Sequence, residues 1–227
     1  MKYFITLLSF LLLSSFLYAQ EGKKIDYTAD RTRVDQENYP DAFILSKVQN
    51  QVYFIHEGIQ VWCDRAIFYQ TDDFFRAFGN VRMKQGDTVN MTSKYAEYNG
   101  DSQFAFASDD VVLTTPSNTL TTDSLFFNRV NQEAFYRSGG KVQDSASTIT
   151  SIRGRYFMNQ EKFSFRRNVK VRNPEYDIDS EHLDFYSEQG HAYLYGPSTI
   201  TSETSVVYCE RGFYDTRNDN GFFVKNY

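Results

Sequence analysis

Several residue types that build enzyme and metal sites are scarce in this chain. Its 227 residues include only 3 His and 2 Cys, and the paired-Cys or His-rich spacings that are typical of metal sites do not occur. A nucleophile elbow of the form G-x-S-x-G and a glycine-rich phosphate loop are also missing. Acidic pairs such as Asp72-Asp73 and Asp109-Asp110 fall at expected turns or corners, where solvated carboxylates are common. We therefore predict that the protein is not an enzyme and holds no metal.

Long apolar runs are also scarce, and the longest one lies near the N-terminus. It extends from Phe4 to Leu13 behind Lys2 and is followed by small residues ending in Ala19. Such a run is too short to span a membrane and is typical of a secretory signal peptide. We expect cleavage after Ala19, with no lipid attachment because no Cys follows the run. The mature chain would be exported and would lack a transmembrane segment.

The charge of the mature chain argues against a nucleic-acid partner. It carries 23 basic and 29 acidic side chains, which gives a formal charge of −6. One segment differs from this average, since its basic residues are accompanied by a single acid, Glu161. A solvated face is one interpretation of this patch, and an anchor for phosphate or carboxylate groups is the other. The candidate patch consists of Arg153, Arg155, Arg166, Arg167, Lys170 and Arg172, with Lys162 beside them.

What the chain does contain is an eight-residue pattern that occurs six times. An aliphatic residue is followed by a small residue two positions later, another small or aliphatic residue at position six and an aromatic residue at position eight. The first copies start at Val61 and Met91, 30 residues apart, and later copies follow at intervals of 29 residues up to Val207. Self-similarity at this period is typical of repeats that stack on their neighbours.

Each repeat is expected to form two long strands, both bent at mid-length. In the fourth copy, Lys162 to Phe165 alternate with both phenylalanines inward, Arg166-Arg167-Asn168 break the alternation, and Val169 and Val171 resume it. Turn residues recur at both ends of the strands, which favours hairpins over the coils of a rectangular β-helix. The predicted fold class is therefore all-β, an elongated β-jellyroll of about six 29-residue repeats of bent antiparallel strands.

We divide the chain into a signal peptide (1–19), an N-terminal partial repeat and loop (20–50) and the repeats (51–227), which can continue beyond the end of this sequence. Cys63 and Cys209 occupy the same repeat position five units apart. At two strands per unit, they should lie on the order of 45 Å from each other. A disulfide requires Cα atoms within about 7 Å, so we expect both thiols to be free.

The inward positions form columns of aliphatic and aromatic residues, which suit either a packed core or a ligand groove. One aromatic column contains Phe68, Tyr98, Phe127, Tyr156, Phe185 and Tyr214. Another pairs Phe75 with Ala77, Phe104 with Phe106, Ala134 with Tyr136, Phe163 with Phe165, and Ala192 with Leu194, and it ends at Phe223.

The repeat, together with several short segments, resembles the OstA/LptA family and is most similar to the OstA-like proteins of Bacteroidetes. The segments are Ala77 to Val81, Gln85 to Thr88, His56-Glu57-Gly58 and Cys63-Asp64. The resemblance implies a periplasmic carrier, associated with outer membrane biogenesis, that shelters the acyl chains of lipopolysaccharide between two walls. It also implies pairing of edge strands with other jellyroll proteins of a transport bridge or with further copies of the chain. Because the energy for such transfer is supplied elsewhere, the resemblance implies no cofactor.

Under this interpretation, part of the columns becomes the lining of a lipid groove. The expected groove residues are Phe68, Tyr98, Phe104, Phe106, Phe127, Tyr136, Tyr156, Phe163, Phe165, Phe185 and Leu194. The alternative is an envelope scaffold with a solid core and partner-binding ends. A carbohydrate-binding or carbohydrate-degrading repeat protein is disfavoured, because no carboxylates cluster in register on one wall.

Overall fold

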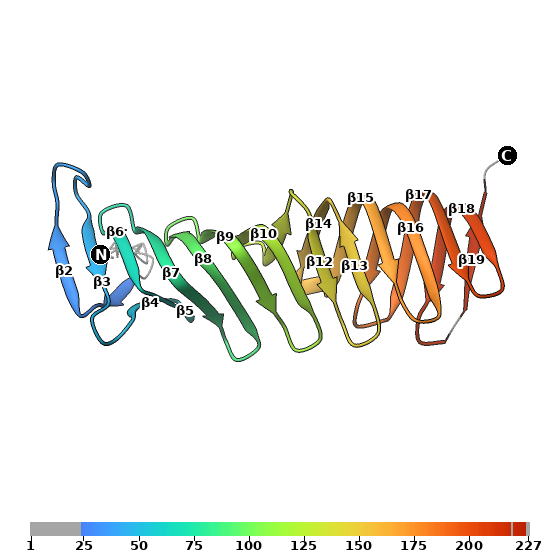
Figure 1. Ribbon diagram of the computed structural model, residues 1–227, viewed down its shortest axis with the longest axis horizontal. Helices are drawn as coiled ribbons and strands as arrows, with labels where there is room; N and C mark the ends of the chain where they lie inside the picture. The colour runs from blue at the N-terminus through green and yellow to red at the C-terminus, as the bar shows by residue number, and fades with distance from the viewer. Residues whose placement is uncertain (1–23, 219, 226–227) are drawn as a thin grey trace, which may run out of the picture.

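The computed structural model describes residues 24–218 and 220–225, and in these residues the chain forms an elongated stack of strands (Figure 1). All strand pairs are antiparallel and belong to one sheet of 19 strands. The N-terminal strands are β1 (Asp26–Thr28), β2 (Arg31–Val34), β3 (Phe43–Ser46), β4 (Val52–His56), β5 (Ile59–Cys63), β6 (Arg65–Tyr69) and β7 (Phe74–Gln85). The middle strands are β8 (Val89–Asn99), β9 (Phe104–Thr114), β10 (Thr119–Asn128), β11 (Glu133–Tyr136), β12 (Gly140–Gln143), β13 (Thr148–Ser151) and β14 (Arg153–Phe157). A short 3-10 helix η1 (Met158–Gln160) precedes β15 (Lys162–Arg172), β16 (Tyr176–Tyr186), β17 (His191–Ser202), β18 (Val206–Asp215) and β19 (Asn220–Val224).

The long strands bend at mid-length, as the sequence predicts. The register of β15 with β16 shifts between Arg166 and Val169, where Arg167 and Asn168 adopt positive φ angles of 65° and 51°. In β7 the shift falls between Phe78 and Val81. These bulges change the direction of the strands and increase their local twist.

The bends divide the sheet into two walls that share an interior. The first wall contains the half-strands equivalent to residues 74–78, which pair with β6, and the second contains those equivalent to residues 81–85, which pair with β5. Buried side chains from both walls belong to one hydrophobic cluster. In the second wall, Val61, Met83 and Met91 are consecutive cross-strand partners, so the predicted aliphatic column is present there.

One predicted column is wrong in β9, where the side chains alternate with the opposite parity. Ala105 and Ala107 are buried, whereas Phe104 and Phe106 are only half-buried and lie on the outer face of the first wall. The Phe106 ring lies 5.0 Å from that of Phe126, which also faces outward. The expected pair is one residue out of phase with the repeat, because the first interval is 30 residues and places Ala105 and Ala107, not Phe104 and Phe106, in register with Phe75 and Ala77.

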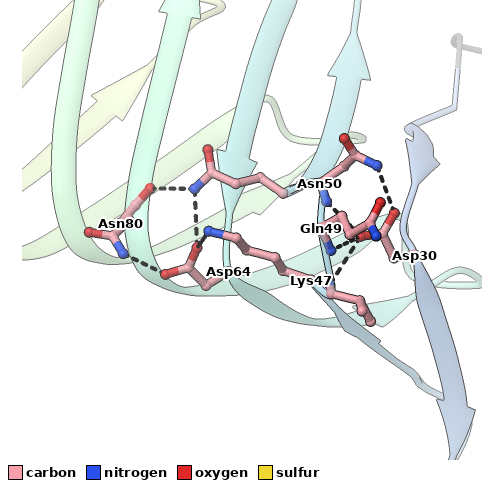
Figure 2. A network of polar contacts seen from close by, with 8 residues as sticks. Asp30, Lys47, Gln49, Asn50, Asp64 and Asn80 are labelled. Atoms are coloured by element: carbon pink, nitrogen blue, oxygen red, sulfur yellow. Dashed lines mark hydrogen bonds and ion pairs between the residues drawn. The ribbon is translucent and has the colours of Figure 1, made fainter.

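A polar network attaches the first strands to the rest of the stack (Figure 2). Asp30 accepts hydrogen bonds from the backbone N–H groups of residues 48–50, and Asn50 adds its side-chain amide. Asp64 accepts from Asn80 at 2.5 Å and pairs with Lys47 at 3.2 Å. These hydrogen bonds lower the pKa of both carboxyl groups, with the Asn50 and Asn80 amides as the largest causes. Two of the segments that carry the family resemblance thus contribute to this network, through Asp64 and Asn80.

The cysteines follow the prediction and one acidic residue does not. Cys63 and Cys209 are both free and buried. Asp73, expected to be solvated, is only 1% exposed and accepts the backbone N–H of Ile25 at 2.9 Å, because β1 and its preceding residues cover this turn. The expected signal peptide lies outside the described residues. Within those residues, none of the helices has the length and apolar character needed to cross a membrane.

Candidate functional site

Aromatic rings fill the interior at the N-terminal end of the stack. Phe54 of the second wall stacks on Phe75 of the first wall, with ring centroids 4.0 Å apart. Phe68 packs edge-on against Phe54, and the Tyr98 hydroxyl contacts Nδ1 of His56 at 2.7 Å. Burial raises the pKa of Tyr98 to about 12, so this side chain stays neutral. The two expected groove residues in this segment, Phe68 and Tyr98, therefore lie in a packed core.

The interior is filled at the N-terminal end because aromatic residues replace aliphatic ones in the column of the second wall. Val61 pairs with Phe54, and Phe54 pairs with Tyr27, so the column continues into β4 and β1 as aromatic residues. The Tyr27 and Phe54 rings reach across the interior to the ring of Phe68. Later members of the column, such as Ile178 and Ile200, are too short to span the same gap.

Between the two ends, the interior narrows to a small apolar cavity of about 20 Å³. Its lining includes Met91, Leu113, Leu125, Phe127 and Ala134. A volume of this size holds about one water molecule and no acyl chain. This segment is nearly closed in the structure.

Further along, Tyr136 fills the space between β11, β12 and β14. A Cβ atom on Gly154 would lie 2.3 Å from the Tyr136 ring, which shows how closely the ring covers that glycine. The Tyr136 hydroxyl lies 2.6 Å from the Ser151 hydroxyl, and burial raises the pKa of Tyr136 to about 12. Tyr156 and Phe163 stack beside it with centroids 4.2 Å apart. These residues bound the open part of the interior.

At the C-terminal end the walls separate and enclose a groove. One cavity of about 600 Å³ is lined by Ile149, Val171, Ile178, Leu183, Phe185, Ala192 and Tyr214, among others. A second, of about 350 Å³, adds Leu194, Ile200, Val207 and Phe223 and shares Ile178, Ala192 and Tyr214 with the first. Because they share lining residues from both walls, we treat the two cavities as one apolar groove. Each volume falls within the range of about 300 to 1,000 Å³ that is usual for ligand sites.

The mouth of the groove is polar and its floor is apolar. The turns at residues 144–147 and 173–175 supply the rim, including the carboxylates of Asp144 and Glu175. Tyr176 follows the second turn and meets Tyr214 edge-on across the groove, with ring centroids 5.5 Å apart. This arrangement suits a ligand with apolar chains that lie inside and a polar part that stays in water.

The structure divides the expected groove residues into four groups. Phe185 and Leu194 line the groove, and Tyr156, Phe163 and Phe165 lie inside the stack next to it. Phe68, Tyr98, Phe127 and Tyr136 belong to closed segments, and Phe104 and Phe106 point outward. Tyr176 was missed, although its position directly after Asn173-Pro174-Glu175 is a signal for a ring at the rim.

The expected basic patch lies on both walls instead of forming one surface. Arg153, Arg155 and Arg166 face outward from the first wall. Lys170 and Arg172 lie on the second wall, where Arg172 pairs with Asp179 at 3.1 Å and Asp177 at 3.6 Å. Arg167 occupies the bulge between them. The bend in β15 therefore separates residues that are adjacent in the sequence.

The histidines have structural partners. Besides the contact of His56 with Tyr98, His182 lies 2.9 Å from Asp184, and His191 lies 3.7 Å from Asp215. Within the described residues, no group of three or more His, Cys, Asp or Glu side chains could hold a metal ion.

Comparisons with known proteins place the chain in a family. Residues 23–181 match the family model described as OstA-like protein. The chain is also similar to a solved structure described as LptH, the LptA homologous periplasmic component of the conserved lipopolysaccharide transport device from Pseudomonas aeruginosa. That match has 15% sequence identity and a TM-score of 0.40, and it covers 43% of this chain and 75% of LptH. Curated proteins yield no match. Since the family model covers most of its length, the chain belongs to the OstA-like family.

Proposed function

We propose that this protein is a periplasmic carrier that shelters the acyl chains of lipopolysaccharide and passes them toward the outer membrane. The observation that carries the proposal is the apolar groove between the walls, with its polar rim. Membership of the OstA-like family supports the same function. We also propose that the stack is a jellyroll of about six repeats.

The groove can shelter acyl chains without catalysing a reaction. Its lining of aliphatic and aromatic side chains matches acyl chains, whose transfer from water is favourable by about 0.8 kcal/mol for each buried CH₂ group. The Asp144 and Glu175 carboxylates at the rim disfavour entry of a phosphorylated head group. The head group would therefore remain outside. No bond is made or broken, so we propose a non-enzymatic protein without a cofactor.

Edge strands supply the proposed contacts with other proteins of a transport bridge or with further copies of this chain. β2 pairs with β3 along one edge and β19 pairs with β18 along the other. Addition of a partner strand at such an edge would extend the sheet by main-chain hydrogen bonds. The groove could then continue from one unit into the next.

The filled N-terminal interior favours a second function, that of an envelope scaffold with partner-binding ends. Phe54 and Phe75 leave no passage for an acyl chain in that segment. Under the scaffold hypothesis, the C-terminal cavities would be closed by a partner and would bind no lipid.

Site-specific photocrosslinking in cells separates the two functions. A photoreactive residue at Phe185 or Tyr214 is expected to yield lipopolysaccharide adducts. A residue at Thr199, on the outer face of the second wall, should yield none. Protein adducts alone from Phe185 and Tyr214, in a folded and exported chain, would contradict the carrier function and support the scaffold.

A further inference from the structure

A second concave site lies on the outer face of the first wall, with the wall between it and the groove. This notch has a volume of about 560 Å³ and is lined by residues of β11, β14 and β15, including Arg153, Arg155 and Arg166, and by Arg137, which directly follows β11. Two features of the strands create it. The chain interrupts its strands at residues 137–139 and at Ile152, and the backbone of Gly154, whose inner side is covered by Tyr136, forms part of the floor.

The arginines of the notch are poorly neutralised by the protein itself. Arg155 pairs with Glu133 at 3.0 Å. For Arg137, Arg153 and Arg166, the described residues provide no carboxylate within ion-pair distance. Arg153 and Arg166 are direct cross-strand partners, and like charges in that arrangement destabilise a sheet. Such an arrangement is typical of a site that is completed by an anion.

Aromatic rings hold two of the guanidinium groups in position. Arg137 lies over Phe126 and Phe135, at 5.3 Å and 5.1 Å from their centroids. Arg155 lies over Phe135 at 5.2 Å and over Phe157 at 5.8 Å. A guanidinium stacked in this way keeps its N–H edges available and loses less rotational freedom when it binds an oxyanion.

We propose that this notch binds a saccharide that carries a phosphate or carboxylate group. The arginines would donate to the oxyanion, which alone would occupy a small part of the volume. Because Arg137 and Arg155 already cover the Phe135 and Phe157 rings, the hydroxyl groups of a sugar would meet the Ser164 hydroxyl and the remaining guanidinium N–H groups of the lining. The inference does not rest on the proposed function, because the notch and the groove lie on opposite faces of the first wall.

The test uses the purified protein in low-salt buffer and isothermal titration with glucose 6-phosphate, a galacturonate oligomer, glucose, inorganic phosphate and an acidic peptide. We expect the charged saccharides to bind more tightly than the other three probes. Arg153→Gln and Arg166→Gln should each weaken binding about tenfold. Lys170→Gln is the matched control, since it removes the same charge from β15, the strand of Arg166, but on the second wall, and binding should be unchanged.

A fold defect would not imitate this result, because the two arginine variants should melt at the same temperature as the unchanged protein or higher. If Lys170→Gln weakens binding as much as the arginine variants do, the loss of binding follows from the change in net charge, and the proposal is overturned. Equal binding of inorganic phosphate would contradict the saccharide, and tighter binding of the acidic peptide would assign the notch to a protein partner.

The source of the saccharide is decided by comparing lipopolysaccharide with its deacylated, phosphorylated saccharide. Because the notch contacts only the saccharide, Arg153→Gln should weaken binding of the deacylated form. Ala192→Phe, which fills the groove, should leave that binding intact. If Ala192→Phe binds lipopolysaccharide as tightly as the unchanged protein does, the groove is contradicted and the notch is not. If Arg153→Gln binds the deacylated saccharide as tightly as the unchanged protein does, the notch is contradicted and the groove is not.

Discussion

The difference between the open and the filled interior can be measured with one substitution made at two places. Ala192 lines both cavities of the groove and pairs with Phe185 and Tyr214 on the neighbouring strands. Ala96 occupies the filled segment, is 0% exposed and pairs with Ala77 and Ala107. A phenylalanine at position 192 would enter empty space, whereas one at position 96 would displace packed atoms.

The expected magnitudes follow from these surroundings. Overpacking a filled core costs about 1 to 3 kcal/mol, so Ala96→Phe should lower the free energy of unfolding by that amount. Full burial of a Phe side chain is worth about 1.5 to 3 kcal/mol, and partial burial in the groove should recover about 1 kcal/mol in Ala192→Phe. The two variants should therefore differ by about 3 kcal/mol.

Urea denaturation of both purified variants, followed by tryptophan fluorescence and circular dichroism, measures this difference. The same samples should show that Ala192→Phe no longer binds a fluorescent fatty acid, while Ala96→Phe binds it when folded. If Ala192→Phe loses as much stability as Ala96→Phe, the C-terminal interior is packed in solution. The reasoning that leads to the groove would then be refuted.

Three further predictions concern acid, thiol chemistry and the parity of the strands. The folded-state pKa values of Asp30 and Asp64 are lowered, so their stabilisation is complete above about pH 5 and declines as pH falls below about 4. Hydrogen exchange of the N-terminal strands should report this loss. Burial raises the pKa of Cys63 to about 12, and a thiol reagent should label it only after unfolding. Phe165→Ala should lower the free energy of unfolding by about 3 to 5 kcal/mol, and Phe106→Ala by about 1 kcal/mol.

Each of these predictions has a contradicting result. Asp30→Asn should weaken the acid dependence of the N-terminal strands, and an unchanged profile would remove the carboxylate from the explanation. Labelling of Cys63 in native buffer would show that its segment opens. Equal losses in Phe165→Ala and Phe106→Ala, measured by urea denaturation, would place both side chains in the core.

The sequence predicts the bent strands well because the signals are local. Arg166 to Asn168 interrupt an alternating run, and the structure has a register shift there. The parity of β9 could not be predicted in the same way. Phe104-Ala105-Phe106-Ala107 alternates equally well in either direction, and only the 30-residue first interval of the repeat, which aligns Ala105 and Ala107 with Phe75 and Ala77, indicates which residues face inward. Hydrophobicity alone favours the larger side chains inside, and here that preference is wrong.

The location of the groove depends on residues that face each other across the interior. A column of rings such as Phe68, Tyr98 and Phe185 continues along the first wall, so this column cannot distinguish a packed segment from an open one. The second wall makes the distinction: Tyr27 and Phe54 fill the gap at one end, and Ile178 leaves it open at the other. Aligning the sequence by cross-strand partners, instead of by repeats within one wall, would have shown this change before the structure was known. The same alignment predicts that Ile178→Phe should close the groove from the opposite wall, with the same loss of lipid binding as Ala192→Phe.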